Sequence, residues 1–111
     1  MLPAAQRMRN SAEFTQTVKA GRRAGRRTVV IHIRPLDEHL SSRAGFVVSK
    51  RVGNAVQRNR VKRRLRHLMR PLLAQARGAI AVVVRANPAA SSEPHRLPGD
   101  LKAAFYQALE S

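Results

Sequence analysis

The spacing of hydrophobic residues predicts a first helix close to the start of the chain. Phe14 and Val18 lie four residues apart and would therefore share one helical face. Residues typical of helix ends flank this pair: Asn10 or Ser11 as the cap, Glu13 to return the capping contact, and Gly21 as the stop.

A longer helical pattern begins after Gly53-Asn54, which interrupts the preceding strand pattern and can cap a helix from Ala55 onward. One face of this helix is apolar and the opposite face is basic, so the helix should pack on a core and expose its charges. Pro71 should kink or end it, although the apolar pattern continues to Leu73. The apolar stripe consists of Val61, Leu65, Leu68, Met69 and Leu72, and the basic face of Arg60, Arg63, His67 and Arg70.

Segments rich in β-branched residues predict strands at 28–34, 44–49 and 79–85. In the first of them Val29, Ile31 and Ile33 would share one face, and Val30, His32 and Arg34 the other. The polar segment 87–98 contains prolines and is expected to form a loop. A last helix should start at Asp100, with an apolar stripe made of Leu101, Ala104, Phe105, Ala108 and Leu109.

This order of elements implies an α+β fold, an α–β sandwich in which helices cover one face of a sheet. The length suits a single domain that takes in residues 1–111. The sheet face that carries His32 and Arg34 would then be open. We therefore expect a groove with cationic walls beside the basic helix.

The charge balance is extreme, with 22 basic and 6 acidic residues and a net charge of +16. Self-repulsion of this size destabilises a compact fold, so an anionic partner is expected to neutralise it. The absence of cysteine excludes disulfides and thiolate metal sites. No apolar stretch approaches the roughly 20 residues of a membrane span, and we expect no membrane association and a cytoplasmic location.

The basic residues concentrate between Lys50 and His67, where eight of eighteen residues are Lys or Arg and none is acidic. Arg58, Lys62 and Arg66 follow one another at intervals of four, along the seam between the apolar stripe and the polar face. Cations in such a position pack their stems on the core and hold their charged ends in place for phosphates. A merely solvated basic face would repel itself, because no Glu is available to pair with it. Nucleic acid is therefore the expected partner.

For three other residues, side-chain chemistry alone does not decide the role. Asn59 can donate to a base, a ribose or a phosphate, or serve as a neutral spacer. Phe14 can stack on a base or belong to the core, and His32 can contact a nucleotide or be inert. Catalytic groups are lacking, because the four histidines show no metal-ligand spacing and the six acids are scattered.

The central motif closely resembles the signature of the protein subunit of bacterial ribonuclease P. It reads Lys50-Arg51-Val52-Gly53-Asn54-Ala55-Val56, followed by Arg58-Asn59-Arg60 and Lys62-Arg63. Weaker matches extend the resemblance over most of the chain: Glu13-Phe14 in the first helix, the strand from Phe46 to Ser49, and the Arg-x-x-Pro segment that ends at Pro88.

The resemblance implies an accessory subunit of an RNA enzyme that removes the 5′ leader from precursor tRNA. The ribonuclease P RNA would carry out the hydrolysis with Mg²⁺, and one protein would bind each catalytic RNA. No residue of the protein would be catalytic, and no metal ligand is assigned. The implied element order is helix, short strand, two strands, helix, strand, helix. The crossover around the basic helix would be left-handed, whereas the pattern alone predicts the usual right-handed one.

By position, the resemblance also assigns two groups of residues. The catalytic RNA would be contacted by Arg58, Asn59, Arg60, Lys62, Arg63 and Arg66, supported by Arg51 and Asn54. A cleft for the precursor tRNA leader would be lined by Phe14, Val18, His32, Ser49 and Lys50. Family members often carry aromatic residues where Val18 and His32 stand here.

Three competing interpretations fit parts of the sequence. A ribosomal or general RNA-binding protein shares the charge but does not require Arg58-Asn59-Arg60 after Gly53-Asn54. A helix-turn-helix DNA binder needs two packed helices around a short turn, whereas strands flank the basic helix here. A nuclease that works without RNA would need acids placed together for metal or acid–base chemistry, and the acids are scattered.

Overall fold

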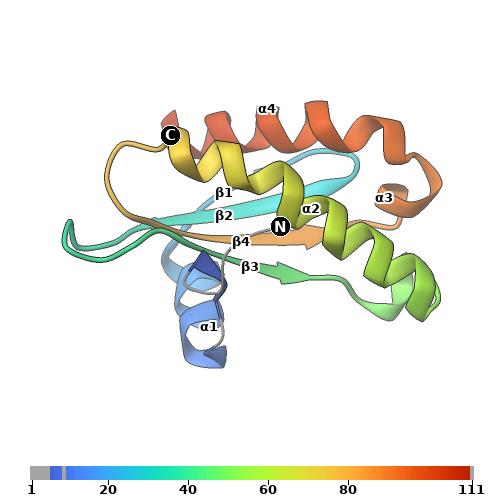
Figure 1. Cartoon of the computed structure of the whole chain (residues 1–111), viewed down its shortest axis with the longest axis horizontal. Helices are drawn as coiled ribbons and strands as arrows, with labels where there is room; N and C mark the ends of the chain where they lie inside the picture. The colour runs from blue at the N-terminus through green and yellow to red at the C-terminus, as the bar shows by residue number, and fades with distance from the viewer. Residues whose placement is uncertain (1–5, 9, 111) are drawn as a thin grey trace.

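The computed structural model describes residues 6–8 and 10–110. Its centre is a four-stranded sheet in the order β1-β2-β4-β3 (Figure 1). The edge strand β3 runs parallel to β4, and the other neighbours are antiparallel. The strands are β1 (Arg22–Gly25), β2 (Val29–Pro35), β3 (Arg43–Val47) and β4 (Ile80–Ala86).

The sheet carries helices on both faces. Helices α2 (Ala55–Gln75) and α4 (Leu97–Glu110) cover one face, and α1 (Ser11–Ala20) lies against the other (Figure 1). Short helical turns complete the chain: η2 (Lys50–Val52), α3 (Ala89–Ser92) and η3 (Pro94–Arg96). The α+β class and the predicted order of the main elements are confirmed.

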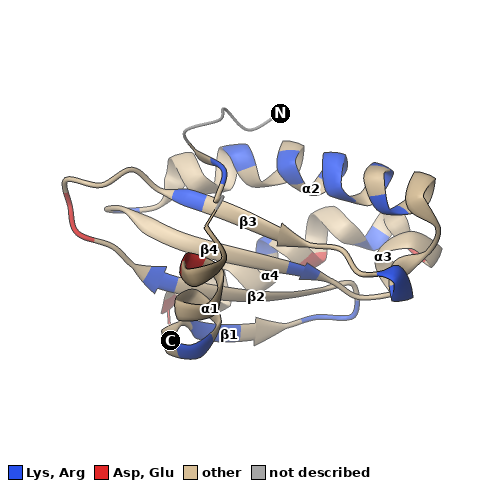
Figure 2. Cartoon of the chain, turned by 90° about the horizontal axis from the view of Figure 1, so that it is seen from below, with Lys and Arg blue, Asp and Glu red and all other residues tan. Residues whose placement is uncertain are grey.

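The connection from β3 to β4 runs through α2 and has the unusual hand. Seen from the α2 side with both parallel strands pointing up, β4 lies to the left of β3 (Figures 1 and 2). The crossover is therefore left-handed, as the resemblance implied, and the rule for parallel strands fails here.

The main core lies between the sheet and the pair α2 and α4. Both helices present the predicted apolar stripes to it, and Leu65, Met69 and Phe105 are completely buried. Strand β4 is buried on both faces, because Val82 and Val84 belong to this core while Ala81 and Val83 form a second cluster with Met8. Along the described part of the chain, no helix is both long and apolar enough to cross a membrane.

The expectation that helices would cover only one sheet face is wrong. Helix α1 packs on the face that carries His32, with the half-buried Phe14 against the second cluster. His32 itself is only 9% exposed. The role predicted for Glu13 in capping is also wrong, because Asn10 alone caps α1 and the Glu13 carboxylate pairs with Arg43 of β3 at 3.3 Å.

Several boundaries differ from the sequence prediction: the limits of the three predicted strands shift by one or two residues, and the strand predicted at 44–49 ends at Val47. Segment 87–98 is not a plain loop, because it contains α3, η3 and the start of α4 at Leu97. Asp100 lies in the first turn of α4 and accepts hydrogen bonds from the backbone N–H and the hydroxyl of Thr28, at 3.1 and 2.7 Å. Helix α2 does not end at Pro71 but continues to Gln75, because Leu72 and Leu73 are buried in the core.

Candidate nucleic-acid interface

The start of the basic helix α2 is fixed by a capping box. The Asn54 side chain accepts a hydrogen bond from the Gln57 N–H at 2.9 Å, and the Gln57 side chain accepts one from the Asn54 N–H at 2.8 Å. Gly53, at φ 155°, leaves room for the Gln57 amide, because a Cβ there would overlap it. These contacts set the rotation of the helix and hence the direction in which each of its cations leaves it.

The cations of α2 form two rows. Arg58, Lys62 and Arg66 are half-buried along the edge of the apolar stripe, which confirms their predicted place at the seam. The residues of the outer row are exposed: Asn59, Arg60, Arg63, His67 and Arg70. Arg64 is half-buried, and it lines a hollow with Ala90, Pro94 and Leu97. Arg51 and Lys50 are exposed in the turn that precedes the helix.

No acid of the described residues pairs with α2, and the Lys and Arg positions, blue in Figure 2, are spread along the helix. Glu13 forms an ion pair with Arg43. Glu93 forms ion pairs with Arg27 at 2.6 Å and with Arg96 at 3.0 Å. The buried Nε atoms of Arg58 and Arg66 have no hydrogen-bond partner within the described part of the chain. The helix therefore presents a fixed and uncompensated row of cations, which a polyanion would neutralise.

The α1 face of the sheet brings together some of the residues predicted for the leader cleft. Pairing of the strands places Arg23, His32, Val83 and Gly45 side by side in one row across the sheet, and the Phe14 ring lies directly over Gly45. Among the other three, Val18 is 36% exposed on α1, and Ser49 and Lys50 are exposed just after β3. The part of this face near the ends of β3 and β4 carries no helix (Figure 2).

His32 is neutral near pH 7 in this setting. Burial lowers the pKa of His32 below its usual value of 6.5, and the nearby Arg23 and Arg85 lower it further. Its Nδ1 is buried and has no hydrogen-bond partner in the described residues. His32 can therefore contact a nucleotide by its ring or by a neutral hydrogen bond, whereas Arg23 and Arg85 supply the charge beside it.

The lowered pKa of His32 predicts how the free protein responds to acid. As the pH falls, the unfolded chain takes up the proton before the folded one, so the free energy of unfolding should decrease as the pH falls below about 6.5. Between about pH 7 and pH 5.5, the free energy of unfolding measured in urea should fall by more for the wild type than for His32→Gln. The variant His39→Gln, in an exposed loop, should follow the wild type, and equal losses in all three proteins would contradict the assignment.

Three residues of this region were missed by sequence reasoning. Arg7 lies before the predicted elements, yet its segment pairs with β3, where the Met8 N–H donates to the Ala44 carbonyl at 2.8 Å. Phe46 was assigned only to a strand, although it faces the cations of α2. Gly45 had a usable signal, because a glycine inside a strand often marks a close approach of another group.

Gly45→Ala tests the position of Phe14. The new Cβ would overlap the Phe14 ring, so the ring must leave the sheet. We expect about 1–3 kcal/mol lower stability and severalfold weaker binding of a 5′ leader, with unchanged affinity for the catalytic RNA. The matched control is Gly25→Ala, where a Cβ would meet only the Val30 side chain at 3.9 Å. Comparing the affinities for leader-bearing and leaderless tRNA separates a loss of leader binding from a general loss of binding. If only Gly25→Ala lost affinity for the leader, the placement of Phe14 over Gly45 would be refuted.

The acids of the described residues do not form a metal site. No three His, Asp or Glu side chains among them come together as ligands, and three of the six acids, Glu13, Glu93 and Asp100, already have other partners. Mg²⁺ usually keeps several waters and binds through one or two carboxylates together with phosphates. A Mg²⁺ ion that met a single carboxylate of this protein would therefore need its other ligands from water or RNA.

Comparison with known proteins identifies the family. The family model described as Ribonuclease P matches residues 2–109. The chain belongs to the ribonuclease P protein family. It is 48% identical to the ribonuclease P protein component of Streptomyces avermitilis, over 98% of this chain and 96% of that protein. With the component from Kocuria rhizophila it shares 52% identity over 85% of this chain and 82% of that protein.

Solved structures of the ribonuclease P protein have the same fold. The Staphylococcus aureus protein superposes with a TM-score of 0.81 at 27% identity, covering 93% of this chain and 94% of that one. The Thermotoga maritima protein, in complex with 1-(4-fluorophenyl)-2-thiourea, gives 0.73 at 25% identity, covering 86% and 94%. As a ribonuclease P protein component, the chain is a subunit of an endoribonuclease that processes the 5′ end of tRNA, and ribonuclease P RNA is its partner. This membership decides against a ribosomal protein and against a helix-turn-helix DNA binder.

Proposed function

We propose that this subunit binds ribonuclease P RNA through α2 and holds the 5′ leader of precursor tRNA on the α1 face of the sheet. The observation that carries the proposal is the row of α2 cations that no acid of the described residues neutralises. Rigid cations on one helix suit the phosphates of a folded RNA, and each neutralised phosphate adds affinity by releasing a counterion.

The two rows of α2 would share the contact with the catalytic RNA. The inner row provides preorganised charges, and Asn59 between Arg58 and Arg60 adds a neutral donor and acceptor. Asn54 supports the surface through the capping box that it forms. The complete proposed set is Arg51, Asn54, Arg58, Asn59, Arg60, Lys62, Arg63 and Arg66.

The leader would lie across the α1 face of the sheet. Phe14 offers a ring on which a base can stack, and Val18 adds an exposed apolar contact. His32 would contact a base rather than a phosphate, because its neutral ring cannot supply charge. Ser49 and Lys50 would reach the sugar–phosphate backbone at the end of β3. Contacts of this kind bind a single strand with little preference for sequence.

The chemistry itself is assigned to the RNA. The protein would contribute no catalytic residue, and Mg²⁺ would be held mainly by the RNA. The proposed complex contains one protein for each catalytic RNA. We place it in the cytoplasm, because transcription and tRNA processing share this compartment in bacteria.

The test is cleavage of a 5′-extended precursor tRNA at low Mg²⁺ in three reactions. These contain the protein alone, the ribonuclease P RNA of Streptomyces avermitilis alone, and the two together. We expect efficient cleavage only in the combination. No stimulation of a well-folded RNA would refute the proposed role, and cleavage by the protein alone would refute the assignment of the chemistry to RNA.

A further inference from the structure

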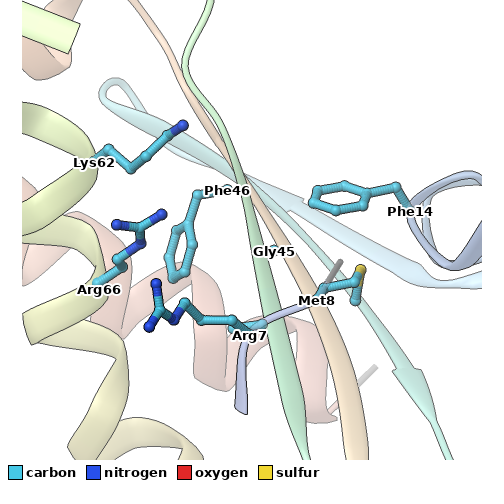
Figure 3. A pocket seen from close by; sticks show the side chains of 8 residues that line it. Arg7, Met8, Phe14, Gly45, Phe46, Lys62 and Arg66 are labelled. Atoms are coloured by element: carbon cyan, nitrogen blue, oxygen red, sulfur yellow. The ribbon is translucent and has the colours of Figure 1, made fainter. Parts of the chain in front are cut away.

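A pocket of about 290 Å³ lies at the outer edge of β3 and is lined from α2 on one face of the sheet and from α1 on the other. The N-terminal segment closes it, because Arg7 pairs with Ala44 of β3. Figure 3 shows the side chains that line it, from both helices and from the strand. The lining residues are Arg7, Met8, Phe14, Ala44, Gly45, Phe46, Lys62 and Arg66.

Three cations line this pocket. The side chains of Arg7, Lys62 and Arg66 all lie on the same side of β3 as the Phe46 ring, with the two guanidinium groups beside that ring and the Lys62 ammonium group further along the strand (Figure 3). None of the three side chains has an ion pair or hydrogen bond with another described residue. The Nε atoms of Arg7 and Arg66 are moreover buried without a partner.

Such an arrangement is costly without a ligand. Like charges repel, and a buried N–H group that has lost water without gaining an acceptor destabilises the fold. An anion with several oxygens would relieve both penalties, because two guanidinium groups can each donate two hydrogen bonds to a phosphate. The geometry of the three cations therefore suits a phosphate group.

An aromatic ring forms the wall beside these cations. The ring of Phe46 is half-buried and lies between β3 and the side chains of Arg7 and Arg66 (Figure 3). A phosphate alone gains nothing from such a ring, whereas a nucleotide presents a phosphate and a flat base together. Stacking of a base on an aromatic side chain requires that the base has left its helix.

We propose that this pocket binds one unpaired nucleotide of ribonuclease P RNA, with its phosphate at Arg7, Lys62 and Arg66 and its base on Phe46. The inference rests on the proposed function, because Lys62 and Arg66 belong to the α2 surface assigned to that RNA. It adds a site that recognises a bulged or looped nucleotide, whereas the cations of α2 outside the pocket recognise phosphates. It also gives the N-terminal segment a direct part in binding.

The test compares three variants in binding to Streptomyces avermitilis ribonuclease P RNA without any tRNA. Phe46→Leu keeps an apolar side chain but removes the ring, Phe46→Tyr restores a ring, and Arg7→Gln removes one charge. We expect about tenfold weaker binding for Phe46→Leu and for Arg7→Gln, and near wild-type binding for Phe46→Tyr. Arg77→Gln is the charge control, because Arg77 is exposed after α2 and outside the pocket.

Chemical probing of the RNA locates the nucleotide. Acylation of ribose 2′-hydroxyls should reveal an unpaired position that the wild type protects and that Phe46→Leu exposes again, while protection elsewhere is unchanged. Equal affinity and equal protection for all variants would overturn the pocket while leaving the proposed function intact. A parallel titration with leader-bearing precursor tRNA tests the alternative ligand: variants that lose affinity only for that tRNA would overturn the assignment to ribonuclease P RNA. Failure of the wild type itself to bind the RNA would instead refute the proposed function.

Discussion

Replacing Arg58 and Arg60 together by alanine should weaken binding to ribonuclease P RNA by about 2–6 kcal/mol. Each substitution removes a charged hydrogen-bond donor worth about 1–3 kcal/mol, and the two residues come from different rows of α2. Arg58 should contribute at least as much as Arg60, because its half-buried stem already fixes its charged end. We expect the fold to be kept, since neither side chain belongs to the core.

Titration of the RNA with protein at several salt concentrations measures this effect. The slope of log K against log salt should become shallower by about 1.5 in the double variant, because two phosphate contacts are lost. Arg77→Ala with Lys102→Ala is the matched control, since it removes the same charge from exposed positions outside the proposed interface. If the control lost as much affinity as Arg58→Ala with Arg60→Ala, net charge alone would account for binding.

The basic surface could be predicted from the sequence because it depends on local geometry. Helical periodicity alone places Arg58, Lys62 and Arg66 on one seam, and Asn54 marks the start of the helix by its capping chemistry. Both features appear in the structure as predicted. The roles of the individual side chains in binding RNA remain predictions.

The position of α1 could not be predicted in the same way. An amphipathic helix shows that it needs an apolar surface but not which face of the sheet supplies it. The sequence did hold one signal, because the run from Ile80 to Val84 is apolar at every position, which is typical of a strand covered on both faces. Glu13 illustrates the same limit, since its partner Arg43 is 30 residues away in the chain.

The pocket at β3 was beyond sequence reasoning for a related reason. Arg7, Phe46 and Arg66 come from three separate segments and meet only because the N-terminal segment pairs with the edge of the sheet. No periodicity relates such residues to one another. The left-handed crossover likewise came from the family resemblance, because general rules of chain connection favour the opposite hand.

Phe105→Ala should cost about 3–5 kcal/mol of the free energy of unfolding. Phe105 on α4 is fully buried against the sheet and makes an edge-to-face contact with Tyr106, with 5.5 Å between ring centroids. Domains of this size are stable by only about 5–15 kcal/mol, and the net charge of +16 should put the free protein toward the low end. We therefore expect Phe105→Ala to be largely or almost completely unfolded in the absence of RNA.

Ribonuclease P RNA should restore much of that loss. A ligand that binds only the folded state at a hundred times its Kd adds about 2.7 kcal/mol, and Phe105 lies in the core rather than on the proposed RNA-binding surface. Pulse proteolysis in urea, with and without saturating RNA, measures both effects, and the many Lys and Arg residues make trypsin suitable. Phe105→Leu should show a smaller loss with the same rescue. If RNA left the urea midpoint of Phe105→Ala unchanged, binding would not be linked to the folded state, and the rigid cationic surface of α2 would not be what the RNA recognises.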